Sequence, residues 1–400
     1  MTLDSLITAA HQQGASDLHL EPGLPAALRL RGALRVVGEP LAGKALLDMA
    51  REAVGAEAWP HFIERRSADF SRNIGGVRCR FNVFHTSRGV GFAIRLLASF
   101  QATIERLNLH PELKKLVLPT TGLILVSGGT GSGKSSTLAA LIQEINLTES
   151  RHVLTIESPI EHVFRSRRAF IRQREVGRDT PSFEQGLLDS LREDPDVLMV
   201  GEIREPETMR LTLNAAETGH LVLATVHSGT CAEALQRVVL AFPSEIQNNI
   251  AAQLADSLVA VVCQRLRFRA DLNLRVPECE ILRSTNPVKT FIRNRDFFKI
   301  PQALETGADF GMWTFERYQA WLSKRTQWHL PGADDEAPDR EETTVENDLL
   351  LLSPSKKSAP RAASAEPGTG DSAANPKRPD GPIDIEPVEG GLEELIKRLT

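Results

Sequence analysis

Residues 128–135 constrain the fold more than any other part of the chain, because they read Gly-Gly-Thr-Gly-Ser-Gly-Lys-Ser. They match the pattern G-x-x-x-x-G-K-[ST], and they lie between the apolar run at 122–126 and the helix-compatible residues 136–142. The pattern needs this strand, loop and helix, since its glycines let the backbone wrap around phosphate groups that the helix N-terminus attracts. The sequence therefore predicts a P-loop inside an alternating βαβ core.

The predicted nucleotide-binding residues are Gly128, Gly129, Thr130, Gly131, Ser132, Gly133, Lys134, Ser135 and Ser136. In such a loop the lysine contacts the β- and γ-phosphates and the serine hydroxyl contacts Mg²⁺. A chance match to the bare pattern in a chain of this length has odds of roughly one in a hundred, and the flanking segments lower these odds further. ATP and Mg²⁺ are therefore the expected cofactors.

Two further apolar runs end in carboxylates. Residues 196–200 lead into Gly201 and Glu202, and residues 154–156 lead into Glu157 and Glu161. Since the carboxyl ends of parallel strands meet at one edge of a sheet, Glu202 is expected beside the P-loop, in the shell of magnesium and water. Glu161 is the candidate general base, because hydrolysis needs a carboxylate beyond the γ-phosphate to orient and deprotonate water. Taken alone, Glu202 could equally be a surface residue, and two glutamates after a strand, such as Glu157 and Glu161, are more often solvated turn residues.

Two histidines and three arginines are weaker candidates. His220 and His227 bracket an apolar run and could sense the γ-phosphate or connect it to the next subunit, although a structural hydrogen-bonding role is the commoner one. Neither has a nearby Cys or His at metal-ligand spacing. Arg80, Arg88 and Arg95 lie in strand-like segments and could supply an arginine finger, in cis or from a neighbouring subunit, or could simply face solvent.

Composition limits the classes of function. A formal net charge of −5 gives no global electrostatic reason to bind nucleic acid or anionic lipid. No apolar run approaches the roughly 18 residues that a membrane-spanning helix needs, and the first residues lack the pattern of a secretory signal. The four cysteines are scattered, which argues against both a zinc site and a disulfide framework. A cytoplasmic protein is expected.

Three regions are predicted along the chain. A helix over 3–12, ended by Gly14, and strand-like segments at 26–37 and 77–97 indicate a small α+β domain over 1–105. A helix-like segment at 107–117 then precedes the ATPase core, which is expected over 106–330. Residues 331–400 hold nine of the 23 prolines and no aromatic residue, so they predict a disordered tail. The tail closes with a short amphipathic segment, Leu392–Leu399, which is either a docking helix or a solvated end.

Six segments occur in one order and resemble those of the type IV pilus retraction ATPases, PilT-like and PilU-like, within the secretion ATPase superfamily. These segments are the residues 14–20, the P-loop, the acidic box at 156–161, the residues 191–202, the residues 216–220 and the residues 310–315. The resemblance spans nearly the whole chain before the tail. It implies a PAS-like N-terminal domain before a RecA-like α/β core, and six chains assembled in a ring that acts on an inner-membrane platform protein.

The resemblance also implies roles for individual residues. It places Lys134 and Ser135 at nucleotide and Mg²⁺, Glu161 as catalytic glutamate, Glu202 in the Walker B segment, His220 and His227 in a His box, Arg80 and Arg95 facing nucleotide, and Arg237 at a subunit interface. Contact with the membrane is expected only through partners, at the inner face of the cytoplasmic membrane.

Several departures from the family pattern bear on the direction of work. Ser158 stands where the acidic box usually has Asp, and Gly129 stands where the P-loop usually has Pro. The A-I-R-N-L-I retraction motif is not found after Asn286-Pro287. This pattern favours an accessory retraction ATPase or a divergent paralogue over the principal retraction motor. The alternatives are an assembly or type II secretion ATPase, a weakly hydrolysing regulatory subunit of a mixed ring and, more distantly, a DNA translocase.

Overall fold

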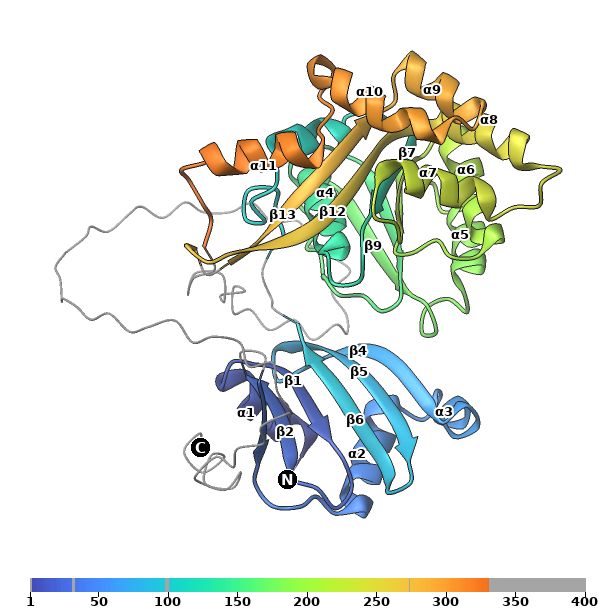
Figure 1. Ribbon diagram of the computed structural model, residues 1–400. Helices are drawn as coiled ribbons and strands as arrows, with labels where there is room; N and C mark the ends of the chain where they lie inside the picture. Colours follow the sequence, from blue (N-terminus) through green and yellow to red (C-terminus); the bar gives the residue numbers. More distant parts are fainter. Residues whose placement is uncertain (1, 31–32, 98–100, 273, 331–400) are drawn as a thin grey trace, which may run out of the picture.

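The computed structural model describes residues 2–30, 33–97, 101–272 and 274–330, and in these residues the chain forms two β-sheets (Figure 1). The blue N-terminal sheet and the larger green-to-orange sheet are built from consecutive stretches of sequence. The predicted disordered tail at 331–400, with its amphipathic segment Leu392–Leu399, lies outside the described residues.

The N-terminal sheet is antiparallel throughout, with the strand order β3-β2-β1-β6-β5-β4. Its strands are β1 (Ala15–Leu20), β2 (Ala26–Leu30), β3 (Ala33–Val37), β4 (Ser67–Ile74), β5 (Val77–Thr86) and β6 (Gly89–Leu96). Three helices pack with it: α1 (Leu3–Gln12), α2 (Gly43–Val54) and α3 (Trp59–Arg65). Alternate residues of β5 are buried, so one face of the sheet carries the core and the other can meet a neighbour.

Helix α1 shows how local sequence determines an element. The Thr2 side chain accepts a hydrogen bond from the backbone N–H of Ser5, and the Ser5 side chain binds back to the cap, which satisfies N–H groups that an open helix end would leave free. The buried Leu3, Leu6 and Ile7 recur at helical spacing. Gly14 follows with φ +69°, a conformation that other residues rarely adopt, and the chain turns into β1.

The second sheet has the strand order β13-β12-β7-β11-β10-β8-β9, parallel except for β13 at one edge. Its strands are β7 (Gly122–Ser127), β8 (His152–Glu157), β9 (Phe170–Glu175), β10 (Val197–Val200), β11 (Leu221–Val226), β12 (Leu258–Arg269) and β13 (Leu274–Arg283). The helices are α4 (Lys134–Thr148), α5 (Phe183–Ser190), α6 (Pro206–Glu217), α7 (Cys231–Leu240), α8 (Gln247–Ser257), α9 (Asn286–Arg293), α10 (Ile300–Thr306) and α11 (Phe315–Lys324). Strand and helix alternate, as predicted for the ATPase core.

Both faces of this sheet are buried. On β7, Leu123 and Leu125 join one hydrophobic core while Ile124 and Val126 join the other. The first core contains residues of α6, α7 and α8, and the second contains residues of α4 and α11. A parallel sheet covered on both sides leaves its strand ends as the place for polar chemistry.

The segment at 107–117 is not the helix that the sequence predicts. Only Pro111–Val117 is helical, as the 3-10 helix η1. Asn108 takes a positive φ of 56°, and Pro111 lacks the N–H that a continuous helix would use at that position. None of the helices in the described parts of the chain is long and apolar enough to cross a membrane.

Candidate active site

The P-loop joins the end of β7 to the start of α4, and its backbone admits only glycine at two positions. A Cβ on Gly128 would lie 2.3 Å from the backbone oxygen of Gln264 and 2.4 Å from Ser132 Oγ. Gly133 has φ +86°, and its Cβ would lie 2.9 Å from Gln264 Nε2. Real Cβ atoms do not approach other atoms so closely, so both glycines allow the loop to pack against strand β12.

Gln264 is a functional candidate that the sequence did not reveal. Its side chain is buried, and Nε2 donates a hydrogen bond of 2.7 Å to the backbone oxygen of Ser132. Its Oε1 accepts a hydrogen bond of 2.6 Å from Thr137 Oγ1 in the first turn of α4. Because C=O and N–H of a trans peptide point in opposite directions, holding the Ser132 carbonyl toward β12 turns the Gly133 N–H the other way. Strand β12 thus fixes the orientation of one amide of the loop.

Lys134 is the first residue of α4. Its Nζ donates hydrogen bonds to the backbone oxygens of Gly128 and Gly129, both at 3.0 Å. Burial lowers the pKa of Lys134, and the negative charges of Glu202 and Glu161 act in the opposite direction. The ammonium group therefore lies over the loop. The carboxylates of Glu161 and Glu202 are close enough for their charges to raise its pKa.

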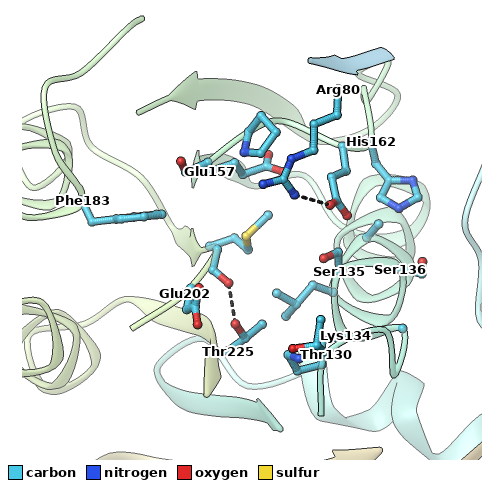
Figure 2. Close-up of a pocket in the computed structure, with 18 of the residues that line it drawn as sticks. Arg80, Thr130, Lys134, Ser135, Ser136, Glu157, His162, Phe183, Glu202 and Thr225 are labelled. Atoms are coloured by element: carbon cyan, nitrogen blue, oxygen red, sulfur yellow. Dashed lines mark hydrogen bonds and ion pairs between the residues drawn. The ribbon is translucent and has the colours of Figure 1, made fainter. Parts of the chain in front are cut away.

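A pocket of about 770 Å³ opens at the carboxyl ends of the parallel strands, and residues of both sheets line it (Figure 2). The predicted site residues that line it are Arg80, Arg95, Thr130, Gly131, Gly133, Lys134, Ser135, Ser136, Glu161, Glu202 and His227. The predicted residues outside its lining are Gly128, Gly129, Ser132, His220, Arg88 and Arg237. The structure thus brings together the P-loop and the two glutamates, as the sequence predicts, although they lie far apart in the chain.

Glu202 follows strand β10 and is held by two cationic or ionisable groups. Its Oε1 lies 2.7 Å from His227 Nε2 and 2.7 Å from Arg204 Nε. Thr225 Oγ1 donates a hydrogen bond of 2.6 Å to the backbone oxygen of Gly201, which fixes the chain just before the glutamate (Figure 2). Burial and the charge of Lys134 lower the pKa of His227. Arg204 lines the pocket and was not among the predicted residues.

Arg80 reaches the pocket from strand β5 of the N-terminal sheet (Figure 2). Its Nη1 lies 3.7 Å from Glu161 Oε1. Asp69 on β4 binds the same guanidinium through two contacts, at 2.7 Å to Nη2 and 3.3 Å to Nε. The hydrogen bonds that Arg80 donates to Asp69 raise the pKa of Arg80, and this paired geometry fixes the plane of the guanidinium. Asp69 is a further contributor that the sequence did not single out.

Glu157, at the end of β8, is the most deeply buried carboxyl in the lining of the pocket. Its Oε1 accepts hydrogen bonds from Thr155 Oγ1 at 2.7 Å and from Gln173 Nε2 at 3.0 Å. Burial raises the pKa of Glu157 to about 7, and the charge of Glu161 acts in the same direction. Near neutral pH a large fraction of Glu157 therefore carries a proton, in contrast to an exposed carboxylate.

Of the remaining arginines, Arg95 and Arg237 have partners of their own. Arg95 lines the pocket, but its side chain is 65% exposed and its Nε lies 3.0 Å from Asp17 Oδ1. Arg88 lies in the exposed turn between β5 and β6, away from the residues that line the pocket. Arg237 on α7 donates from Nη1 to the backbone oxygen of His227 at 2.7 Å. Arg237 thus supports the loop that carries His227.

The two predicted histidines lie at opposite ends of strand β11. His227 follows the carboxyl end, in the pocket, whereas His220 precedes the amino end and its Nδ1 lies 3.0 Å from the backbone oxygen of Ala215. The structure does not bring His220 into the pocket of its own chain. A role for His220 in catalysis stays a prediction.

Comparison with known proteins identifies the family. The family model described as Type II/IV secretion system protein matches residues 1–299. The chain is 40% identical over 318 residues to the type IV pilus retractation ATPase PilT of Pseudomonas aeruginosa, covering 79% of this chain and 92% of that protein. It is 33% identical over 354 residues to the type IV pilus ATPase PilU of the same organism, covering 88% and 91%.

A solved structure shares the fold. The crystal structure of the pilus retraction motor PilT with bound ADP matches with a TM-score of 0.71 and 35% identity, over 80% of this chain and 96% of that chain. The match includes a nucleotide-bound protein, and the pocket of this chain carries the P-loop and both glutamates at the expected edge of the sheet. The chain therefore belongs to the Type II/IV secretion system protein family and, within it, to the PilT-like and PilU-like ATPases of type IV pili.

Proposed function

We propose that this chain hydrolyses ATP to power the retraction of a type IV pilus. One observation carries the proposal. A single pocket gathers Lys134 of the P-loop, Glu161 of the acidic box and Glu202 after β10, which are the groups that phosphoryl transfer to water requires. The similarity to PilT and PilU along most of their lengths supports retraction as the work that this hydrolysis drives.

The substrate of this site is Mg²⁺-ATP. Amide groups of the P-loop and Lys134 bind the phosphates, while the oxygens of Ser135 and Glu202 are suited to Mg²⁺ and its water. Clusters of three or more metal-ligating side chains are absent from the part of the chain that the structure describes, and an ion that travels with phosphates does not need one. Glu161 orients and deprotonates the attacking water, and Arg80 neutralises charge that develops on the transferred phosphoryl group.

The working assembly that we propose is a ring of six chains at the inner face of the cytoplasmic membrane, acting on the platform protein of the pilus. Residues 1–105 form its N-terminal domain and residues 106–330 its ATPase domain. Arg95 and Arg237 are exposed enough to contact a neighbouring subunit. Arg95 lines the pocket, and Arg237 binds the backbone of His227, which also lines it. A mixed ring with a paralogous ATPase would use the same surfaces.

A steady-state ATPase assay on the purified full-length chain tests this proposal. The Lys134→Ala variant should lose activity by more than about 100-fold, because the lysine contacts the phosphates whose charge grows during the reaction. Lys44→Ala is the matched control, since Lys44 is exposed on α2, outside the pocket lining. Equal activity in the parent and the Lys134→Ala variant would refute the site.

The direction of work is tested in cells. A strain that carries Glu161→Gln should display surplus pili that do not retract, and twitching should stop. A strain without surface pili would instead identify an assembly motor. A parent protein that binds ATP but turns none over, with or without the platform protein, would identify a regulatory subunit.

A further inference from the structure

A buried polar cluster joins the N-terminal sheet to the ATPase sheet, beside the loop of the acidic box. Its centre is Glu175 at the end of strand β9, which is 2% exposed. Glu175 Oε1 accepts a hydrogen bond of 3.1 Å from the Ser71 backbone N–H, and Oε2 accepts one of 2.6 Å from Ser71 Oγ. Oε2 also accepts a hydrogen bond of 3.1 Å from the Ile160 backbone N–H. One carboxylate therefore binds both the N-terminal sheet and the loop of the acidic box.

Arg78 on strand β5 completes the cluster. Its Nη2 and Nε donate hydrogen bonds to the backbone oxygen of Ile160, at 2.9 Å and 3.3 Å. Nη2 also donates to Ser71 Oγ, and it lies 3.7 Å from Glu175 Oε2. Ser71, Arg78 and Glu175 thus hold the N–H and the C=O of one residue, Ile160, so that residue can neither rotate nor withdraw without breaking several hydrogen bonds.

The cluster lies next to both partners of the catalytic contact. Ile160 directly precedes Glu161 in the chain, and Arg78 and Arg80 stand two residues apart on β5, so they project from the same face of the sheet. Ser71 is paired with Arg80 across β4 and β5. Arg80 Nη1 and Glu161 Oε1 are in contact, and the cluster fixes the chain two residues before Arg80 and one residue before Glu161.

We propose that Glu175 is a positioning residue, acting through Ser71 and Arg78, that holds Arg80 of the N-terminal sheet against Glu161 of the ATPase sheet. The inference rests on the proposed function and deepens it. Glu175 is absent from the lining of the pocket, so it acts without touching the nucleotide. It sets the geometry of the groups that stabilise the transition state. A displacement of these groups by about 1 Å is enough to slow catalysis.

The Glu175→Gln substitution tests the inference with little change in volume. The new amide NH₂ must face either the Ser71 N–H, or both Ser71 Oγ and the Ile160 N–H, so at least one hydrogen bond is lost. The buried guanidinium of Arg78 also loses its opposing charge. We expect kcat of the full-length chain to fall at least about tenfold, while KM for ATP stays within about threefold, because the P-loop that binds the phosphates is untouched.

A double variant separates a positioning role from a merely structural one. If Glu175 acts by holding Arg80 against Glu161, then the loss of kcat in Glu175→Gln combined with Arg80→Ala should be clearly smaller than the product of the two single losses. The matched control is Glu193→Gln: Glu193 pairs with Arg174 of the same strand β9 and does not touch the N-terminal sheet. This control should keep kcat within about twofold of the parent.

Ser71→Ala offers a second variant should Glu175→Gln fail to fold, because it removes only the hydroxyl between Arg78 and Glu175. We expect it to lower kcat in the same way, and its loss combined with that of Arg80→Ala should also be smaller than the product of the two. A double variant whose loss equals the product of the two single losses would overturn the inference, as would an unchanged kcat in Ser71→Ala. A parent chain that hydrolyses no ATP would overturn the proposed function and this inference with it.

Discussion

Replacing Gln264 by Leu tests whether strand β12 braces the P-loop. Leucine has a similar volume, so the substitution removes the hydrogen bonds with Ser132 and Thr137, the weak one from Cys279 Sγ, and little packing. The groups left without a partner are the Ser132 carbonyl and the Thr137 hydroxyl, both next to the buried side chain of Gln264. The consequence should appear both in the stability of the fold and in the affinity for nucleotide.

The magnitude follows from the cost of buried, unsatisfied polar groups, which is about 1–3 kcal/mol each. Two such groups give a total of about 2–6 kcal/mol, which divides between the free energy of unfolding and the nucleotide affinity. A Tm that falls by about 4 °C or more corresponds to the lower end, at about 2–4 °C per kcal/mol for a domain of this size. If about 1.4 kcal/mol of the total acts on the loop, then Kd for ADP rises tenfold.

The assay combines thermal unfolding of the full-length chain with a titration of a fluorescent ADP analogue. The matched control is Val261→Ala on the same strand, because Val261 is fully buried in the core on the other face of the sheet. It should lower the Tm and leave the Kd for ADP unchanged. Adding Thr137→Val to Gln264→Leu removes one of the unsatisfied groups and should restore part of the stability. A Gln264→Leu variant that binds ADP as tightly as the parent would refute the brace.

Two further predictions concern the carboxyl groups of the pocket. Glu161→Gln should retain ATP while single-turnover hydrolysis is lost; a variant that no longer binds a fluorescent ATP analogue would contradict the role of Glu161 as general base. Burial raises the pKa of Glu157 from its ordinary value of 4.5 to about 7, so the folded chain keeps a proton that the unfolded chain releases, and stability attributable to Glu157 should fall as the pH rises from about 4.5 to about 7. The Tm of the Glu157→Gln variant should therefore fall less than the Tm of the parent between pH 5 and pH 7. Parallel Tm profiles of the two proteins would show that the Glu157 carboxyl does not titrate in that range.

The parts of the site that the sequence predicts are those with a local signature. The P-loop has one, because glycine spacing and flanking elements are all encoded within residues 122–142. Glu202 has another, since an apolar run that ends in a carboxylate predicts the edge of a parallel sheet, and the structure places β10 beside β8 and β11. Helix α1 was predictable in the same way from its periodicity and the glycine that ends it.

The residues that the sequence missed act across long separations. Gln264 contacts Ser132 and Thr137 over 132 and 127 positions, and Glu175 contacts Ser71 over 104. A single polar residue in an apolar strand has no pattern that says which distant group it satisfies. Only the strand order, which joins β12 to β7 and brings the N-terminal sheet against β9, supplies the partner.

The positions of the two predicted histidines depend on the strand between them. His220 and His227 are close in sequence, but the extended strand of six residues between them spans about 20 Å. The two side chains therefore leave the sheet at opposite edges. Residues that flank a strand are far apart in space. Residues that flank a helix with the same number of residues are closer, because a helix rises less per residue.

The strand order also sets the width of the reaction site. Between β7, which carries the P-loop, and β8, which carries the acidic box, lie β11 and β10. Three steps of about 4.8 Å therefore part the two strand ends by roughly 14 Å. A change of shear or twist in those middle strands would alter that span, and with it the distance between the P-loop and the acidic box.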